Sequence, residues 1–157
     1  MNSHDFAKQL AASKEFFDRS TRVLEERDSG FRPQQGMMTA AQQVAHAAQT
    51  VEWFIEGVTR PQGFDLDFEK LAKETAGVTS LVAARKRLDA AYAQAIEFIR
   101  SRKPEDLARP LPAGPVMGGQ PMSDIVWGIV EHSAHHRGAL TAYSRMLGKV
   151  PPMPYGD

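Results

Sequence analysis

Four stretches of the chain repeat apolar residues at the three- and four-residue intervals of an amphipathic α-helix. These predicted helices cover about residues 4–27, 39–59, 79–102 and 123–148. The third is the most regular, with apolar residues at Leu81, Ala84, Leu88, Ala91, Ala95 and Phe98. No stretch shows a convincing strand pattern. The chain therefore predicts an all-α, up-and-down four-helix bundle that forms one domain over residues 1–157.

The boundaries of the helices carry their own signals. Thr39 and Gln42 form the T-x-x-Q capping box that begins a helix, and Gly148, followed by two prolines, is typical of a helix end. Residues 60–78 predict a connection with a short helix near residues 67–74. Residues 103–121 contain five prolines and three glycines, which favour an ordered loop or a short hairpin over a helix.

The second predicted helix has apolar or aromatic residues on two opposed sides. Val44, Ala48, Val51, Ile55 and Val58 form one stripe, while His46, Trp53 and Gly57 lie on nearly the opposite side. A helix of this kind is expected to be buried on both sides. We therefore expect one side to face the bundle centre and the other to face a second subunit, in a homodimer whose interface includes the Val44 stripe.

The fourth predicted helix carries the most informative pattern. At 100° per residue, one narrow stripe contains Ile125, Ile129, His132, His136, Leu140, Tyr143 and Leu147. Two histidines thus replace central apolar residues, one turn apart, and this spacing suits a transition-metal ion about 2.0–2.1 Å from each imidazole. The alternative is a pair of structural histidines, which would leave four ring nitrogens to satisfy in a dry core.

His46 is the natural third ligand. In an up-and-down bundle the second and fourth helices run parallel and lie diagonally, and a modest stagger brings His46 level with His132 and His136. Neither the H-E-x-x-H pattern of zinc hydrolases nor the Glu-x-x-His pattern of di-iron bundles occurs. Three protein ligands leave a position for water or substrate, as in catalytic sites. Nitrogen ligands suit zinc, nickel, copper or iron, and we expect zinc or nickel.

Composition narrows the function further. Lys plus Arg and Asp plus Glu number 19 each, and this balance argues against a nucleic-acid partner. No apolar run is long enough to span a membrane, and the N-terminal residues lack the features of a signal peptide, so we expect a cytoplasmic protein. The chain has no cysteine, so a thiol that takes part in the chemistry must come from another molecule.

The residues also match a known family. The segment E-H-S-A-H-H-R-G at 131–138, the V-A-H-A-A-Q-T-V-E-W-F segment at 44–54, and the order of the four helices resemble the DinB-like (DinB/YfiT-like) metalloenzymes. The resemblance implies a four-helix bundle, a metal bound by His46, His132 and His136, and a homodimer. Some members are thiol-dependent transferases or isomerases, and others are described as metal-dependent hydrolases.

Three functions follow from these observations. The first is a metal-dependent S-transferase that uses a low-molecular-weight thiol as co-substrate, with the metal lowering the pKa of the thiol. The second is a metal-dependent hydrolase, and the third is a non-enzymatic protein that binds a metal or small molecule in a stress response. Both enzymes act on a small-molecule substrate.

Five further residues are weaker candidates for the site. Glu131 and Arg137 are candidate catalytic residues, Glu131 as a base and Arg137 as a partner for an anionic group. His135, Trp53 and Tyr143 are expected to support the ligands or to line the cleft. For each of them the alternative is an ordinary packing or surface role. Tyr155, near the end of the chain, is a further candidate that would fold over the site.

Overall fold

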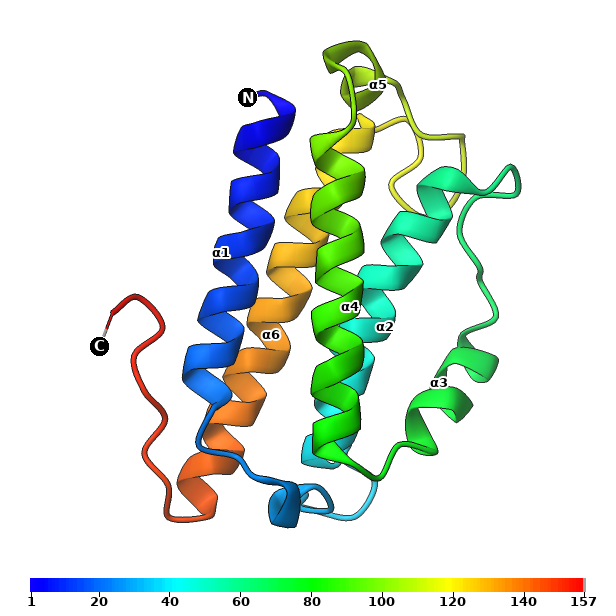
Figure 1. Cartoon of the computed structure of the whole chain (residues 1–157). Coiled ribbons are helices and arrows are strands. Elements are labelled where there is room, and N and C mark those ends of the chain that lie inside the picture. The colour runs from blue at the N-terminus through cyan, green and yellow to red at the C-terminus, as the bar shows by residue number, and fades with distance from the viewer. Residues whose placement is uncertain (157) are drawn as a thin grey trace.

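The computed structural model describes residues 1–156 as a bundle of four long helices (Figure 1). The bundle consists of α1 (Ser3–Thr21), α2 (Ala40–Thr59), α4 (Leu81–Arg100) and α6 (Ile125–Met146). Two short helices, α3 (Phe68–Ala76) and α5 (Pro104–Ala108), and the 3₁₀ turns η1 (Glu26–Asp28) and η2 (Met122–Asp124) lie in the connections. The all-α four-helix bundle is confirmed.

Most helix boundaries agree with the sequence pattern. Thr39 caps α2 by accepting a hydrogen bond from the Gln42 backbone N–H, and the Gln42 side chain accepts from the Thr39 N–H in return. Helix α1 ends at Thr21, before the predicted residue 27, and the chain continues through η1. The prediction that residues 103–121 contain no helix was wrong over five residues, because Pro104 lies at the first helical turn, where its missing N–H costs nothing.

The arrangement of the helices differs from the predicted one. Helix α2 packs against α4 and α6, and α1 packs against the same two helices, so α2 and α6 are neighbours and not a diagonal pair. They are also antiparallel, because Gln43 near the start of α2 bonds to Tyr143 near the end of α6. In Figure 1, α1 and α6 run downward while α2 and α4 run upward. The neighbours α2 and α4 run parallel, because the connection through α3 brings the chain back to the end of the bundle where α2 begins.

The apolar stripe of α2 lies inside the single chain. Val44 and Ala48 are fully buried and Val51 is 1% exposed, among side chains that belong to the core of the bundle. The prediction that this stripe forms a subunit interface was therefore wrong: α2 uses it to pack against its neighbours. The homodimer stays a prediction without this support.

A buried hydrogen-bonded group fixes the rotation of α6. The Tyr92 hydroxyl of α4 donates to Ser133 Oγ at 2.7 Å, and it lies 3.0 Å from Ser13 Oγ of α1. Burial raises the pKa of Tyr92, which therefore stays a neutral donor. Ser133 faces these two helices, so its neighbour His132 and the next turn at His136 face α2.

In residues 1–156, no helix is long and apolar enough to cross a membrane.

Candidate metal centre

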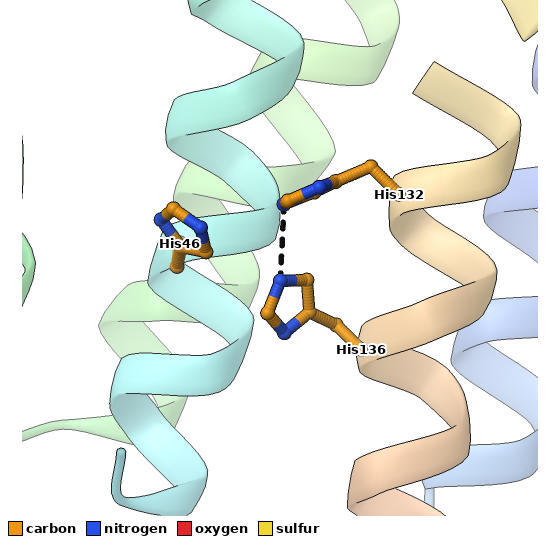
Figure 2. Close-up of side chains that lie close together, drawn as sticks. All are labelled: His46, His132 and His136. Atoms are coloured by element: carbon orange, nitrogen blue, oxygen red, sulfur yellow. Dashed lines mark hydrogen bonds between the residues drawn. The ribbon is translucent and has the colours of Figure 1, made fainter. Parts of the chain in front are cut away.

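Three histidines converge between α2 and α6 (Figure 2). One ring nitrogen from each of His46, His132 and His136 lies within 4.8 Å of the others. The Nε2 atoms of His132 and His136 are 3.0 Å apart, close to the roughly 3.3 Å that separates two nitrogens bound tetrahedrally to zinc. The predicted ligand set is thus brought together. It forms although α2 and α6 are antiparallel, with His46 the seventh residue of α2 and His132 and His136 the eighth and twelfth residues of α6.

A chain of hydrogen bonds orients His136. The Tyr143 hydroxyl donates to the Met38 carbonyl at 2.8 Å, and it accepts from Gln43 Nε2 at 3.3 Å. The other end of the Gln43 amide, its oxygen Oε1, therefore faces His136 and accepts from the Nδ1–H of its ring. With the proton on Nδ1, the lone pair of His136 lies on Nε2, which faces His132 and the site.

The three histidines are held in the neutral form. Burial, with a smaller contribution from the neighbouring histidines, lowers the pKa of His132 from 6.5 to about 4 and that of His136 to about 3. Burial also lowers the pKa of His46, although a hydrogen bond with Gln49 opposes the shift. A metal needs neutral imidazoles as ligands, so the site is ready to bind a divalent ion at neutral pH without first releasing protons.

The donor set fits a transition metal and not calcium or magnesium. Three imidazole nitrogens suit zinc, nickel, copper or iron, whereas calcium and magnesium need oxygen ligands. Thr50 Oγ1 of α2 lies 3.0 Å from His132 Nε2, the nitrogen that also faces His136, so this contact would give way when Nε2 binds a metal. In residues 1–156 every buried polar side-chain atom has a partner, so the case for a metal rests on the convergence and chemistry of the three rings.

A cleft of about 590 Å³ opens beside the histidines. His46 and His132 line one part of it, and most other walls are apolar, formed by Trp53, Phe54, Phe68, Leu71, Met117 and Trp127. Gly128 is needed here, since a Cβ atom at this position would lie only 2.6 Å from the Phe54 ring. The size and lining are typical of a small-molecule site.

Two of the weaker candidates lie in this cleft and one lies behind it. Glu131 and Trp53 line the cleft, and Trp53 is held by a 2.7 Å hydrogen bond from its Nε1 to the Asp65 carbonyl. Tyr143 is buried behind His136 and acts on it through Gln43.

The remaining candidates lie elsewhere. His135 is exposed, with its ring 5.0 Å from that of His136, and it does not line the cleft. Arg137 lies in a separate groove between α1 and α6, with its guanidinium 6.0 Å from the Phe16 ring. The expectation that Tyr155 covers the site was wrong, because its ring packs against Phe16, 5.1 Å away, in the same groove as Arg137.

Sequence reasoning missed Gln43, Gln49 and Thr50. Gln49 holds α3 beside the cleft: its Nε2 donates to the Leu71 carbonyl at 3.0 Å, and its Oε1 accepts from Thr75 at 3.1 Å. All three residues lie three or four positions from His46 on the same helix. That spacing was a usable signal, since polar residues beside an inward-facing histidine share its face.

The comparisons with known proteins agree with this fold. The structure of YfiT from Bacillus subtilis, described as "a probable metal-dependent hydrolase with an unusual four-helix bundle topology", matches with a TM-score of 0.72 and 15% identity. The match covers 94% of this chain and 88% of YfiT, and at this identity it shows the fold alone. No curated protein matches the chain. The model of the DinB superfamily matches residues 9–140, and the chain therefore belongs to that superfamily.

Proposed function

We propose that this protein is a metal-dependent enzyme in which His46, His132 and His136 bind one divalent transition metal beside a small-molecule cleft. The observation that carries the proposal is the convergence of three neutral imidazoles, two of which line the wall of an apolar cleft. A closed site would favour a structural metal or a binding protein, whereas this cleft opens to solvent. We propose zinc or nickel, both of which accept nitrogen ligands readily.

The reaction that we propose is attack of the sulfur of a low-molecular-weight thiol on an apolar electrophile, in which a carbon–sulfur bond forms, the bond to a leaving group such as chloride breaks, and the thiol proton is released. When bound, the metal supplies Lewis acidity, which lowers the pKa of a thiol that it contacts. The protein has no cysteine, so the thiol would come from a co-substrate. The apolar walls would hold the electrophile and exclude water, and Glu131, which lines the cleft, would accept the released proton.

Hydrolysis is the second candidate, and one observation favours it. Glu131 lines the cleft next to His132 in the chain, and a carboxylate there can serve as the general base for water. The description of YfiT as a probable metal-dependent hydrolase points in the same direction.

The test separates these functions by their dependence on thiol. Protein loaded with zinc or nickel is incubated with chlorodinitrobenzene, with and without a thiol, and separately with a nitrophenyl ester. Metal-dependent arylation of the thiol that is lost in His46→Ala supports the transferase, and ester hydrolysis without thiol supports the hydrolase. His4→Ala, which alters an exposed histidine far from the site, is the matched control. Metal binding without either reaction, across a panel of thiols and esters, contradicts the proposed enzyme.

A further inference from the structure

The cleft contains one charged side chain among the residues that the structure describes. Of the fifteen residues that line it, only Glu131 carries a formal charge at neutral pH. None of the other fourteen lining residues is a lysine or an arginine. The cleft therefore offers an acidic oxygen and aromatic walls, and it offers no cation from the protein.

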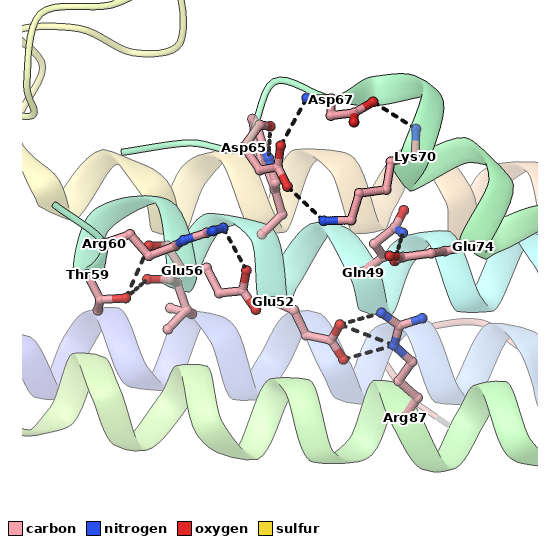
Figure 3. Close-up of polar contacts among 12 residues, drawn as sticks. Gln49, Glu52, Glu56, Thr59, Arg60, Asp65, Asp67, Lys70, Glu74 and Arg87 are labelled. Carbon is pink, nitrogen blue, oxygen red and sulfur yellow. Dashed lines mark hydrogen bonds and ion pairs between the residues drawn. The ribbon is translucent and has the colours of Figure 1, made fainter. Parts of the chain in front are cut away.

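The cations of the hollow beside the cleft are paired with carboxylates. A polar hollow on the far side of Trp53 and Leu71 contains Arg60, Lys70 and Arg87 (Figure 3). Arg87 bonds to Glu52 at 2.5 Å, Lys70 to Asp65 at 3.2 Å, and Arg60 to Glu56 at 3.5 Å. Arg137, the candidate partner for an anionic group, lies in the groove between α1 and α6.

The aromatic walls suit a flat apolar body. Trp53 packs against Phe64 and Phe68, with ring centroids 4.6 and 6.4 Å apart, and Trp127 is 70% exposed at the cleft. The faces of aromatic rings carry partial negative charge, so they attract cations and disfavour anions. An anion that entered this cleft would lose water without gaining a charged partner from the protein.

We propose that the cleft takes an apolar, aromatic molecule without a negative charge, and that Glu131 selects cationic or hydrogen-bond-donating molecules over anionic ones. The inference rests on the proposed function only in taking this cleft as the substrate site. Here Glu131 is a specificity-determining residue, which binds the polar end of the molecule while the aromatic walls bind its body.

The test uses three probes that share one apolar body: phenylpropylammonium, phenylpropanol and phenylpropanoate. Both tryptophans line the cleft, but Trp127 also lines the groove that contains Arg137, so the fluorescence of Trp53 in a Trp127→Phe background reports binding in the cleft. In metal-free protein we expect the ammonium probe to bind about tenfold more tightly than the carboxylate at low salt, and the difference to shrink as salt is added. Glu131→Gln should bring the two dissociation constants within about twofold of each other. Glu105→Gln, which removes the same charge from α5 outside the cleft, should leave the preference unchanged.

The decisive quantity is the ratio of the two dissociation constants in the wild type compared with that in Glu131→Gln. The ratio is measured with and without metal. Because the metal charge acts on the probes in both the wild type and Glu131→Gln, its contribution cancels when the two ratios are compared. Equal binding of both probes, an unchanged preference in Glu131→Gln, or no binding of any probe would overturn the inference. Selective binding without any metal-dependent reaction would instead sink the proposed function and leave the inference standing.

Discussion

Replacing Gln43 by leucine tests how the site presents His136. The change removes the oxygen that accepts from His136 Nδ1–H and leaves that buried donor without a partner. Loss of such a partner typically lowers metal affinity 10- to 100-fold, or about 1.4–2.7 kcal/mol. The unsatisfied donor should also lower the free energy of unfolding by about 1–3 kcal/mol. Tyr143→Phe removes a hydroxyl that contacts Gln43 and not His136 itself, so it should lower metal affinity and the free energy of unfolding by smaller amounts.

Zinc affinity is measured by competition with a chelating dye, and circular dichroism checks that each variant is folded. Gln94→Leu, on the exposed face of α4, is the matched control and should leave affinity unchanged. Because Gln43 and Tyr143 act through one chain of bonds, the double variant should lose less affinity than the two single losses added together. Zinc affinity in Gln43→Leu within twofold of the wild type would refute the reasoning.

Three further predictions concern stability. His132→Leu should abolish zinc binding and leave the free energy of unfolding of the metal-free protein within about 1 kcal/mol of wild type, because an apolar side chain replaces the half-buried ring on an apolar stripe. A variant that is unfolded by circular dichroism would show that His132 is structural. The unfolded chain binds more protons than the folded chain between pH 6.5 and about 4, since burial lowers the pKa of His132 to about 4 and that of His136 to about 3. The free energy of unfolding of metal-free protein should therefore be highest above pH 6.5. Below pH 6.5 it should fall by up to about 1.4 kcal/mol per pH unit for each histidine. A free energy of unfolding, measured by denaturant titration, that stays constant across this window would contradict the pKa assignment. Gly128→Ala should destabilise the protein by about 1–3 kcal/mol and displace Phe54 in the cleft, and an unchanged melting temperature would contradict the close approach of the Phe54 ring.

The sequence predicted the helices because their signals are local. Apolar spacing located all four long helices, and the capping box at Thr39 located the start of α2 to the residue. The pairing of the helices depends on the route of the long connections, which leaves no periodic trace in the sequence. For that reason the diagonal, parallel placement of α2 and α6 was wrong.

The candidate site was predictable for a related reason. His132 and His136 break an apolar stripe, and such a break is visible in the sequence. The burial of the Val44 stripe, in contrast, could not be predicted without knowing which helices lie beside α2. Arg137 was misplaced for another reason: it follows His136 directly but lies on another face of α6, away from the cleft. The position of Gln43 on the His46 face could be read from the sequence, but its hydrogen bond to Tyr143, one hundred residues away, is visible only in the folded chain.

The metal content of purified protein tests the central claim most directly. The protein is prepared without chelator, loaded with zinc or nickel, desalted and measured by elemental analysis, alongside His46→Ala, His132→Ala and His136→Ala. The site predicts one metal ion per chain in the wild type and in the exposed control His135→Ala, and loss of that metal in each of the three ligand variants. Wild-type metal content in all three ligand variants would contradict the assignment of these histidines as ligands.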